Sequence, residues 1–117
     1  MVGLAMNDAD KIANAFRKFH RENPSVYDEL VKISRSLKHK GRGHYGIGAL
    51  FEVIRFHRAL QTNDPSFKLN NNYRALYARL IMENEPDLDG FFDTRIRKAR
   101  INYEIEAALA NVFANMA

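Results

Sequence analysis

Cysteine is absent from the 117 residues of this chain. Disulfide bonds, zinc sites built on thiolates and a cysteine nucleophile are therefore excluded. No apolar run approaches the roughly 18 residues that a membrane-spanning helix needs, and no charged segment followed by a long apolar run opens the sequence. We therefore expect a soluble, cytoplasmic protein with no membrane partner.

Recognisable catalytic motifs are also absent. The sequence has neither a phosphate-binding Walker A loop nor a dinucleotide-binding fingerprint, and its four histidines form no HExxH pair or other ligand-spaced cluster. Carboxylates gather at 83–89 and could hold Mg²⁺ for a nuclease, but their spacing across Pro86 is typical of a solvated turn. We expect no enzymatic activity, no cofactor and no metal site.

Composition and length predict one globular domain over residues 1–117. Hydrophobic residues make up 46% and charged residues 27%, and the formal net charge is +4. The basic residues are concentrated in two segments, whereas 32–58 contains a single acid, Glu52. These basic residues are Lys32, Arg35, Lys38, Lys40, Arg42, Arg55 and Arg58, followed by Arg95, Arg97, Lys98 and Arg100. Such segregation suits a polyanionic partner.

Periodicity and capping signals predict a mainly α fold of about five helices. We expect them near 8–20, 24–40, 47–61, 71–84 and 99–116, with Asn7 or Asp8 capping the first helix and Asn23 the second. Gly41 should end the second helix and Pro86 the fourth. The third helix carries the widest apolar surface, including Val53, Phe56 and Leu60, and is predicted to be central.

The third and fourth helices could form a helix-turn-helix or winged-helix-like core. Roughly nine residues separate them, whereas the usual turn has about three or four, and winged-helix variants tolerate a longer connection. Residues 91–97 partly alternate in polarity, which fits either a short strand or wing, or the start of the last helix.

One face of the predicted fourth helix has the chemistry of a DNA-reading surface. A helical wheel places Asn71, Arg74, Ala75, Ala78, Arg79 and Met82 opposite the apolar stripe of Tyr73, Leu76, Tyr77, Leu80 and Ile81. Asn pairs well with adenine and Arg with guanine in the major groove. Asn71, Arg74 and Arg79 are therefore predicted to contact the groove. Alternatively, one Asn caps the helix and the others face water.

Phosphate contacts are predicted at two basic segments. The run 38–45 sets Lys38, Lys40 and Arg42 among glycines, which let backbone approach a phosphate closely. Arg95, Arg97 and Lys98 would add contacts from a basic strand or wing. A basic helix end followed by a glycine stop explains the first run equally simply.

Longer stretches of the sequence carry a family pattern. The runs HYGIGALFEVIRFH at 44–57, FKLNNNYRALYARLIME at 67–83 and GFF at 90–92 resemble a family of small uncharacterised proteins encoded by bacteriophages and prophages. The resemblance covers about residues 19–97. It implies a bacterial or phage setting and carries no established activity.

These observations favour a phage-type accessory or regulatory protein that binds double-stranded DNA through the basic run and the helix starting at Asn71. The alternative is a protein-interaction module that binds or inhibits a host protein. The last helix supports that alternative, and also a homodimer, because Ile105, Leu109 and Val112 lie on one apolar stripe.

Overall fold

The computed structural model describes residues 7–64 and 67–93 and divides the chain into two compact units. The first unit comprises residues 1–22 and 95–117, and the second comprises 23–94. The described residues are mainly helical, as predicted, and contain no extended strand. The predicted fifth helix near 99–116 and the residues 94–97 of the proposed wing lie outside the described residues.

In the first unit, α1 (Asp8–Glu22) is the described element. Asn7 caps it, because its Oδ1 accepts a hydrogen bond of 2.8 Å from the amide of Asp10. Its buried face is formed by Ala9, Ala13 and Phe16, and the ring of Phe16 stacks on that of His20.

The second unit contains α2 (Pro24–His39), α3 (Ile47–Gln61), η1 (Asn71–Tyr73), α4 (Arg74–Asn84) and η2 (Pro86–Leu88). Proline at the first helical position starts α2, and the side chain of Asn23 makes no capping hydrogen bond. Gly41 ends that helix with a φ of +94°, a conformation that glycine adopts without strain. Asn84 is the last residue of α4, and Pro86 then begins η2.

The core of this unit lies among α2, α3 and α4, which pack against one another in all three combinations. The predicted stripe of α4 is confirmed, since Tyr73, Leu76, Tyr77, Leu80 and Ile81 are all buried. It meets the inward face of α3, where Phe51 packs edge-on against Tyr77 with ring centroids 5.9 Å apart. Polar contacts also join α2 to α3, because His57 contacts Glu29 and Arg58 donates to Ser25.

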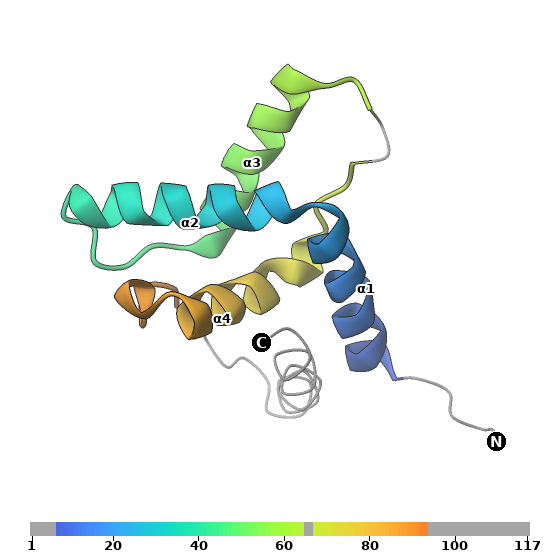
Figure 1. Ribbon diagram of the computed structural model, residues 1–117, viewed down its shortest axis with the longest axis horizontal. Coiled ribbons are helices and arrows are strands. Elements are labelled where there is room, and N and C mark those ends of the chain that lie inside the picture. Colours follow the sequence, from blue (N-terminus) through green and yellow to red (C-terminus); the bar gives the residue numbers. More distant parts are fainter. Residues whose placement is uncertain (1–6, 65–66, 94–117) are drawn as a thin grey trace. The chain divides into compact units, whose positions relative to one another are not determined.

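The prediction that α3 is the central helix is wrong. Only its inward-facing residues Ile47, Leu50, Phe51 and Ile54 are buried. By contrast, Val53, Phe56 and Leu60 are 37%, 63% and 72% exposed. Figure 1 shows why, since α3 rises past α2 and its C-terminal turns extend beyond the other helices of the unit. The central position belongs to α4, which contacts α2, α3, η1 and η2.

Candidate nucleic-acid interface

The basic turn, residues 38–44, is held in place at both ends. At its start, the amide of Arg42 donates to the carbonyl of Leu37 at 3.0 Å. At its end, the amide of Tyr45 donates to the carbonyl of Phe91 at 3.1 Å, and Tyr45 forms an isolated parallel bridge with Phe92. Both Phe91 and Phe92 are buried. The turn is therefore fastened to the core by backbone contacts, and the ring of His44 adds a contact to the carbonyl of Gly90 at 3.3 Å.

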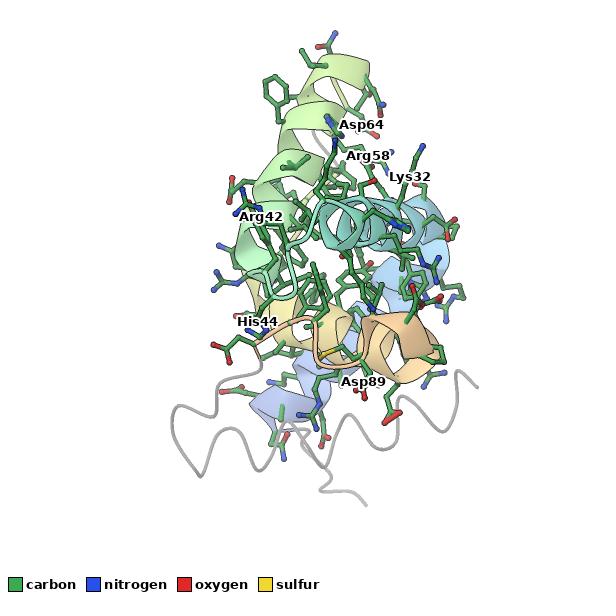
Figure 2. The ribbon with its side chains drawn as sticks, turned by 90° about the vertical axis from the view of Figure 1, so that its left-hand side faces the viewer. Lys32, Arg42, His44, Arg58, Asp64 and Asp89 are labelled. Carbon is green, nitrogen blue, oxygen red and sulfur yellow. The ribbon has the colours of Figure 1, made fainter. Side chains whose placement is uncertain are left out.

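The three cations of the basic turn have different surroundings. Lys38 donates to the backbone carbonyl of Asp87 and so joins α2 to η2. In contrast, Lys40 and Arg42 are exposed and form no ion pair with any described residue. Figure 2 shows Arg42 and His44 along one edge of the unit and Lys32 at the opposite edge. Of the predicted phosphate contacts in this turn, Lys40 and Arg42 are thus the two that stay available.

The asparagine turn, residues 70–72, leads into α4 and is organised by its own side chains. The Oδ1 atom of Asn70 accepts a 2.8 Å hydrogen bond from the amide of Asn72, so Asn70 is the residue that caps. Asn71 is exposed, and its Oδ1 accepts from Nη2 of Arg55 at 2.6 Å. The same Arg55 nitrogen donates to the carbonyl of Leu69 at 2.5 Å. Arg55 therefore fixes the position of Asn71, a role that the sequence pattern did not reveal.

Arg74 connects the start of α4 to the start of α3. Its Nε donates to the carbonyl of Asn71 at 3.1 Å. Its side chain lies so close to Gly48 that a Cβ there would be 3.4 Å from Nη1. Arg74 is exposed and makes no ion pair with a described residue. Gly48 lies six positions after Arg42 in the chain, so the Cα atoms of these two residues are at most about 20 Å apart.

The rest of the predicted reading face of α4 is less available. Ala78, predicted to be exposed, is only 1% exposed, and that prediction is wrong. The cause is the central position of α4, which buries residues over more than half of its circumference. Arg79 and Met82 are half-buried, whereas Ala75 is exposed. What α4 presents to a partner is chiefly its first turn, together with the asparagine turn.

Carboxylates at the far end of α4 form a separate network with α2. Arg35 donates to Oε1 of Glu85 at 2.6 Å. It also donates to both side-chain oxygens of Asp87, at 2.9 and 3.0 Å. Tyr27 donates to Oε2 of Glu85 at 2.8 Å. These hydrogen bonds lower the pKa of Asp87 and raise that of Arg35, while burial, more than its bond to Glu85, raises the pKa of Tyr27. Glu85 and Asp87 are thus structural ion-pair partners.

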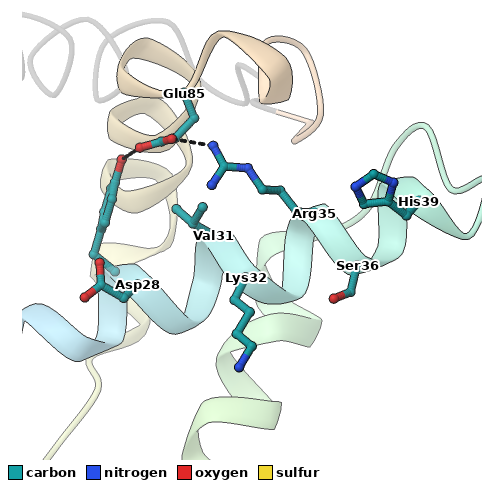
Figure 3. A pocket seen from close by; sticks show the side chains of 8 residues that line it. Asp28, Val31, Lys32, Arg35, Ser36, His39 and Glu85 are labelled. Atoms are coloured by element: carbon teal, nitrogen blue, oxygen red, sulfur yellow. Dashed lines mark hydrogen bonds and ion pairs between the residues drawn. The ribbon is translucent and has the colours of Figure 1, made fainter.

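A shallow hollow of about 400 Å³ lies beside this network (Figure 3). Its lining comes from α2 and Glu85, with Arg35 in the middle, and both polar and apolar side chains contribute. Arg35 donates to the two carboxylates through Nε and Nη2, and Lys32 also lines the hollow.

Some predictions concern residues beyond the described part. Arg95, Arg97 and Lys98, and the homodimer contact through the last helix, lie outside the described residues. Within the described ranges, no three histidine or acidic side chains are grouped so that they could hold a metal ion. The same ranges contain no helix that is long and apolar enough to cross a membrane.

Comparison with known proteins gives no match to this chain among family models, curated proteins or solved structures.

Proposed function

We propose that this chain binds duplex DNA as an accessory or regulatory protein, through the basic turn, the asparagine turn and Arg74. One observation carries the proposal: Lys40, Arg42 and Arg74 are exposed and pair with no carboxylate among the described residues, although Arg35 on the same unit pairs with two. Exposed cationic side chains that do not pair with neighbouring carboxylates can bind the phosphates of a nucleic acid.

The residues divide by the kind of contact that each can make. Lys40 and Arg42 lie on a glycine-containing turn, which suits phosphate contacts that position the protein without reading sequence. Arg74 and Asn71 sit at the beginning of a helix, where base-edge contacts are made in helix-turn-helix proteins. Arg74 has a fork of donors for guanine. Asn71 has an amide donor for adenine, and its Oδ1, which accepts from Arg55, has a second lone pair for the adenine amino group.

Burial of α4 restricts how this helix could approach the groove. With Ala78 buried, the helix cannot lie lengthwise in the groove with its whole outer face in contact. If the N-terminal end of α4 points into the groove, the asparagine turn contacts the DNA first and Arg74 next. This approach leaves the core unchanged. Arg55 supports such an approach by bonding Asn71 and thereby limiting the freedom of its side chain.

Charge counts indicate a local interaction. Residues 23–93 carry ten basic and nine acidic side chains, so this part of the chain has almost no long-range attraction for DNA. Most of the net positive charge of the chain lies outside residues 23–93. It includes Arg95, Arg97 and Lys98, which we propose as additional phosphate contacts. The resemblance to phage-encoded proteins makes the bacterial cytoplasm the proposed location.

Two variants with the same charge change test the proposal. Arg74→Gln removes a proposed base contact, and Lys32→Gln removes an exposed cation from the edge of the unit opposite Arg42 and His44 (Figure 2). Fluorescence anisotropy with a labelled duplex at low salt should show Arg74→Gln weakening binding by about fivefold to 150-fold, because a bidentate base contact contributes about 1 to 3 kcal/mol. Lys32→Gln should bind within about twofold of the unmodified chain. Equal losses in both variants, or no binding at micromolar protein, would refute the proposed surface.

A further inference from the structure

The outward face of α3 carries an apolar row that nothing described so far uses. The outer seam, as we call it, consists of Ala49, Val53, Phe56 and Leu60, and all four are exposed. Phe56 and Leu60 are large apolar side chains that are 63% and 72% exposed. Scattered apolar residues are ordinary on a surface, but a continuous row on one helix face is typical of an interaction site.

The spacing of the outer seam is that of a helix-pairing surface. Its successive members are four, three and four residues apart, which is the alternation that keeps apolar side chains facing a second helix in a coiled coil. The seam is also accessible, because the C-terminal turns of α3 extend beyond α2 and α4 (Figure 1). The surface therefore fits another α-helix.

The order of side-chain sizes along the outer seam matches an antiparallel copy of itself. If a two-fold axis passes midway between Val53 and Phe56, Val53 faces Phe56 of the second copy and Ala49 faces its Leu60. Each layer then pairs a small side chain with a large one, which fills the space evenly. A parallel pair would instead place Phe56 against Phe56 and Ala49 against Ala49, which crowds one layer and leaves a gap in another.

Charges beside the outer seam are compatible with the antiparallel pair. Glu52 is the exposed charged residue next to the seam, and Arg55 contacts its carboxylate. In the antiparallel arrangement Glu52 lies beside Ala59 of the second copy. The two Glu52 side chains stay about 11 Å apart, from a helix rise of about 1.5 Å per residue and an interaxial distance of about 8 Å. At that separation salt screens most of their repulsion.

We propose that this chain self-associates through the outer seam of α3, as an antiparallel two-fold pair in which Ala49 meets Leu60 and Val53 meets Phe56. The seam is about 18 Å long, and its few apolar side chains offer less than the roughly 800 Å² per partner of a standard stable interface. The pair is therefore weak and forms with rising protein concentration. It requires no DNA, so its test is independent of the DNA-binding proposal.

Cysteine cross-linking tests the register directly, because the natural sequence contains no cysteine. The double variant Ala49→Cys/Leu60→Cys places the two sulfurs of one chain about 16 Å apart along the helix, too far for a bond within the chain. The antiparallel pair brings each Cys beside its counterpart in the second copy. Mild oxidation at about 100 μM protein should therefore yield a covalent dimer from the double variant, whereas the single variants Ala49→Cys and Leu60→Cys should stay monomeric.

Adding Phe56→Glu to the double variant supplies the control, because a charge at the centre of the seam should reduce dimer formation at least severalfold. A matched glutamate at Ser36, which is exposed on α2 and outside the seam, should leave most of the dimer. Covalent dimers from the single variants would indicate a parallel or random encounter and overturn the proposal. So would a double variant that stays monomeric, which would leave the seam to a different protein.

Discussion

Asp87 is the most heavily bonded carboxylate at the contact between α2 and η2. Both of its side-chain oxygens accept from Arg35, and its backbone carbonyl accepts from Lys38. An exposed ion pair adds little stability on average. This one should contribute more than most, because Arg35 bonds both oxygens of Asp87 and also pairs with Glu85. The pKa of Asp87 lies below its usual value because the hydrogen bonds from Arg35 favour the charged carboxylate.

This pKa shift predicts how stability depends on pH. Because the pKa of Asp87 is lower in the folded than in the unfolded chain, its contribution is complete above the unfolded pKa of about 3.9 and is lost as the pH falls below it. The facing groups are Arg35, Lys38 and Glu85. In Asp87→Asn, the loss of unfolding free energy between pH 7 and pH 3 should be smaller than in the unmodified chain. Urea unfolding at the two pH values measures it.

Glu83→Gln removes an equal charge from an exposed position of α4 that forms no ion pair within the described ranges. This control should keep the full loss of stability between pH 7 and pH 3. If Asp87→Asn showed the same loss as this control, the Arg35 contact would not be the source of the acid sensitivity.

The ends of α3 could be predicted from the sequence, whereas the fourth helix, predicted at 71–84, divides into η1 (Asn71–Tyr73) and α4 (Arg74–Asn84). The predicted ends of α3 at Ile47 and Gln61 agree with the structure, because Gly46 and the polar residues after Gln61 are strong local signals. The burial of a helix face depends on which other elements pack against it. The sequence pattern of one helix does not contain that information. Val53 and Phe56, which the pattern assigns to a central helix, are exposed, and Ala78, which the helical wheel sets on the outer face, is buried.

The burial of α4 on more than one side leads to a matched prediction. Ala78→Leu inserts three heavy atoms at a site that is only 1% exposed, and it should lower the free energy of unfolding by about 1 to 3 kcal/mol. Ala75→Leu makes the same change three residues earlier, at an exposed position, and should shift it by less than about 0.5 kcal/mol. Denaturant midpoints of the two variants give the comparison. Equal stability of both variants would place Ala78 on an open face after all.

At the scale of the whole molecule, the candidate interface combines residues from three parts of the chain. Lys40, Arg42, Asn71 and Arg74 were predicted from their residue types, whereas the supporting roles of Gly48 and Arg55 depend on contacts across 16 or more positions. Such contacts leave no periodic signal in the sequence. The separation of Lys38 from Lys40 and Arg42 likewise depends on where Asp87 lies in space.

The proposed phosphate contacts predict a specific salt dependence. Each cation that neutralises a phosphate contributes about 0.9 to the slope of log K against log salt concentration on duplex DNA. The double variant Lys40→Gln/Arg42→Gln should therefore lower the magnitude of that slope by about two. Anisotropy titrations between about 50 and 200 mM salt provide the slopes. An unchanged slope would exclude these two residues as phosphate contacts.

We propose that duplex DNA contacts the surface formed by the basic turn, the asparagine turn and the first turn of α4. Amide chemical shifts of a ¹⁵N-labelled sample, recorded while a duplex is added, test it residue by residue. We expect the largest changes at 40–44, at Gly48 and at 70–75, and we expect added salt to reverse them. Changes confined to the outer seam at 49–60, or no salt-sensitive changes at all, would contradict it.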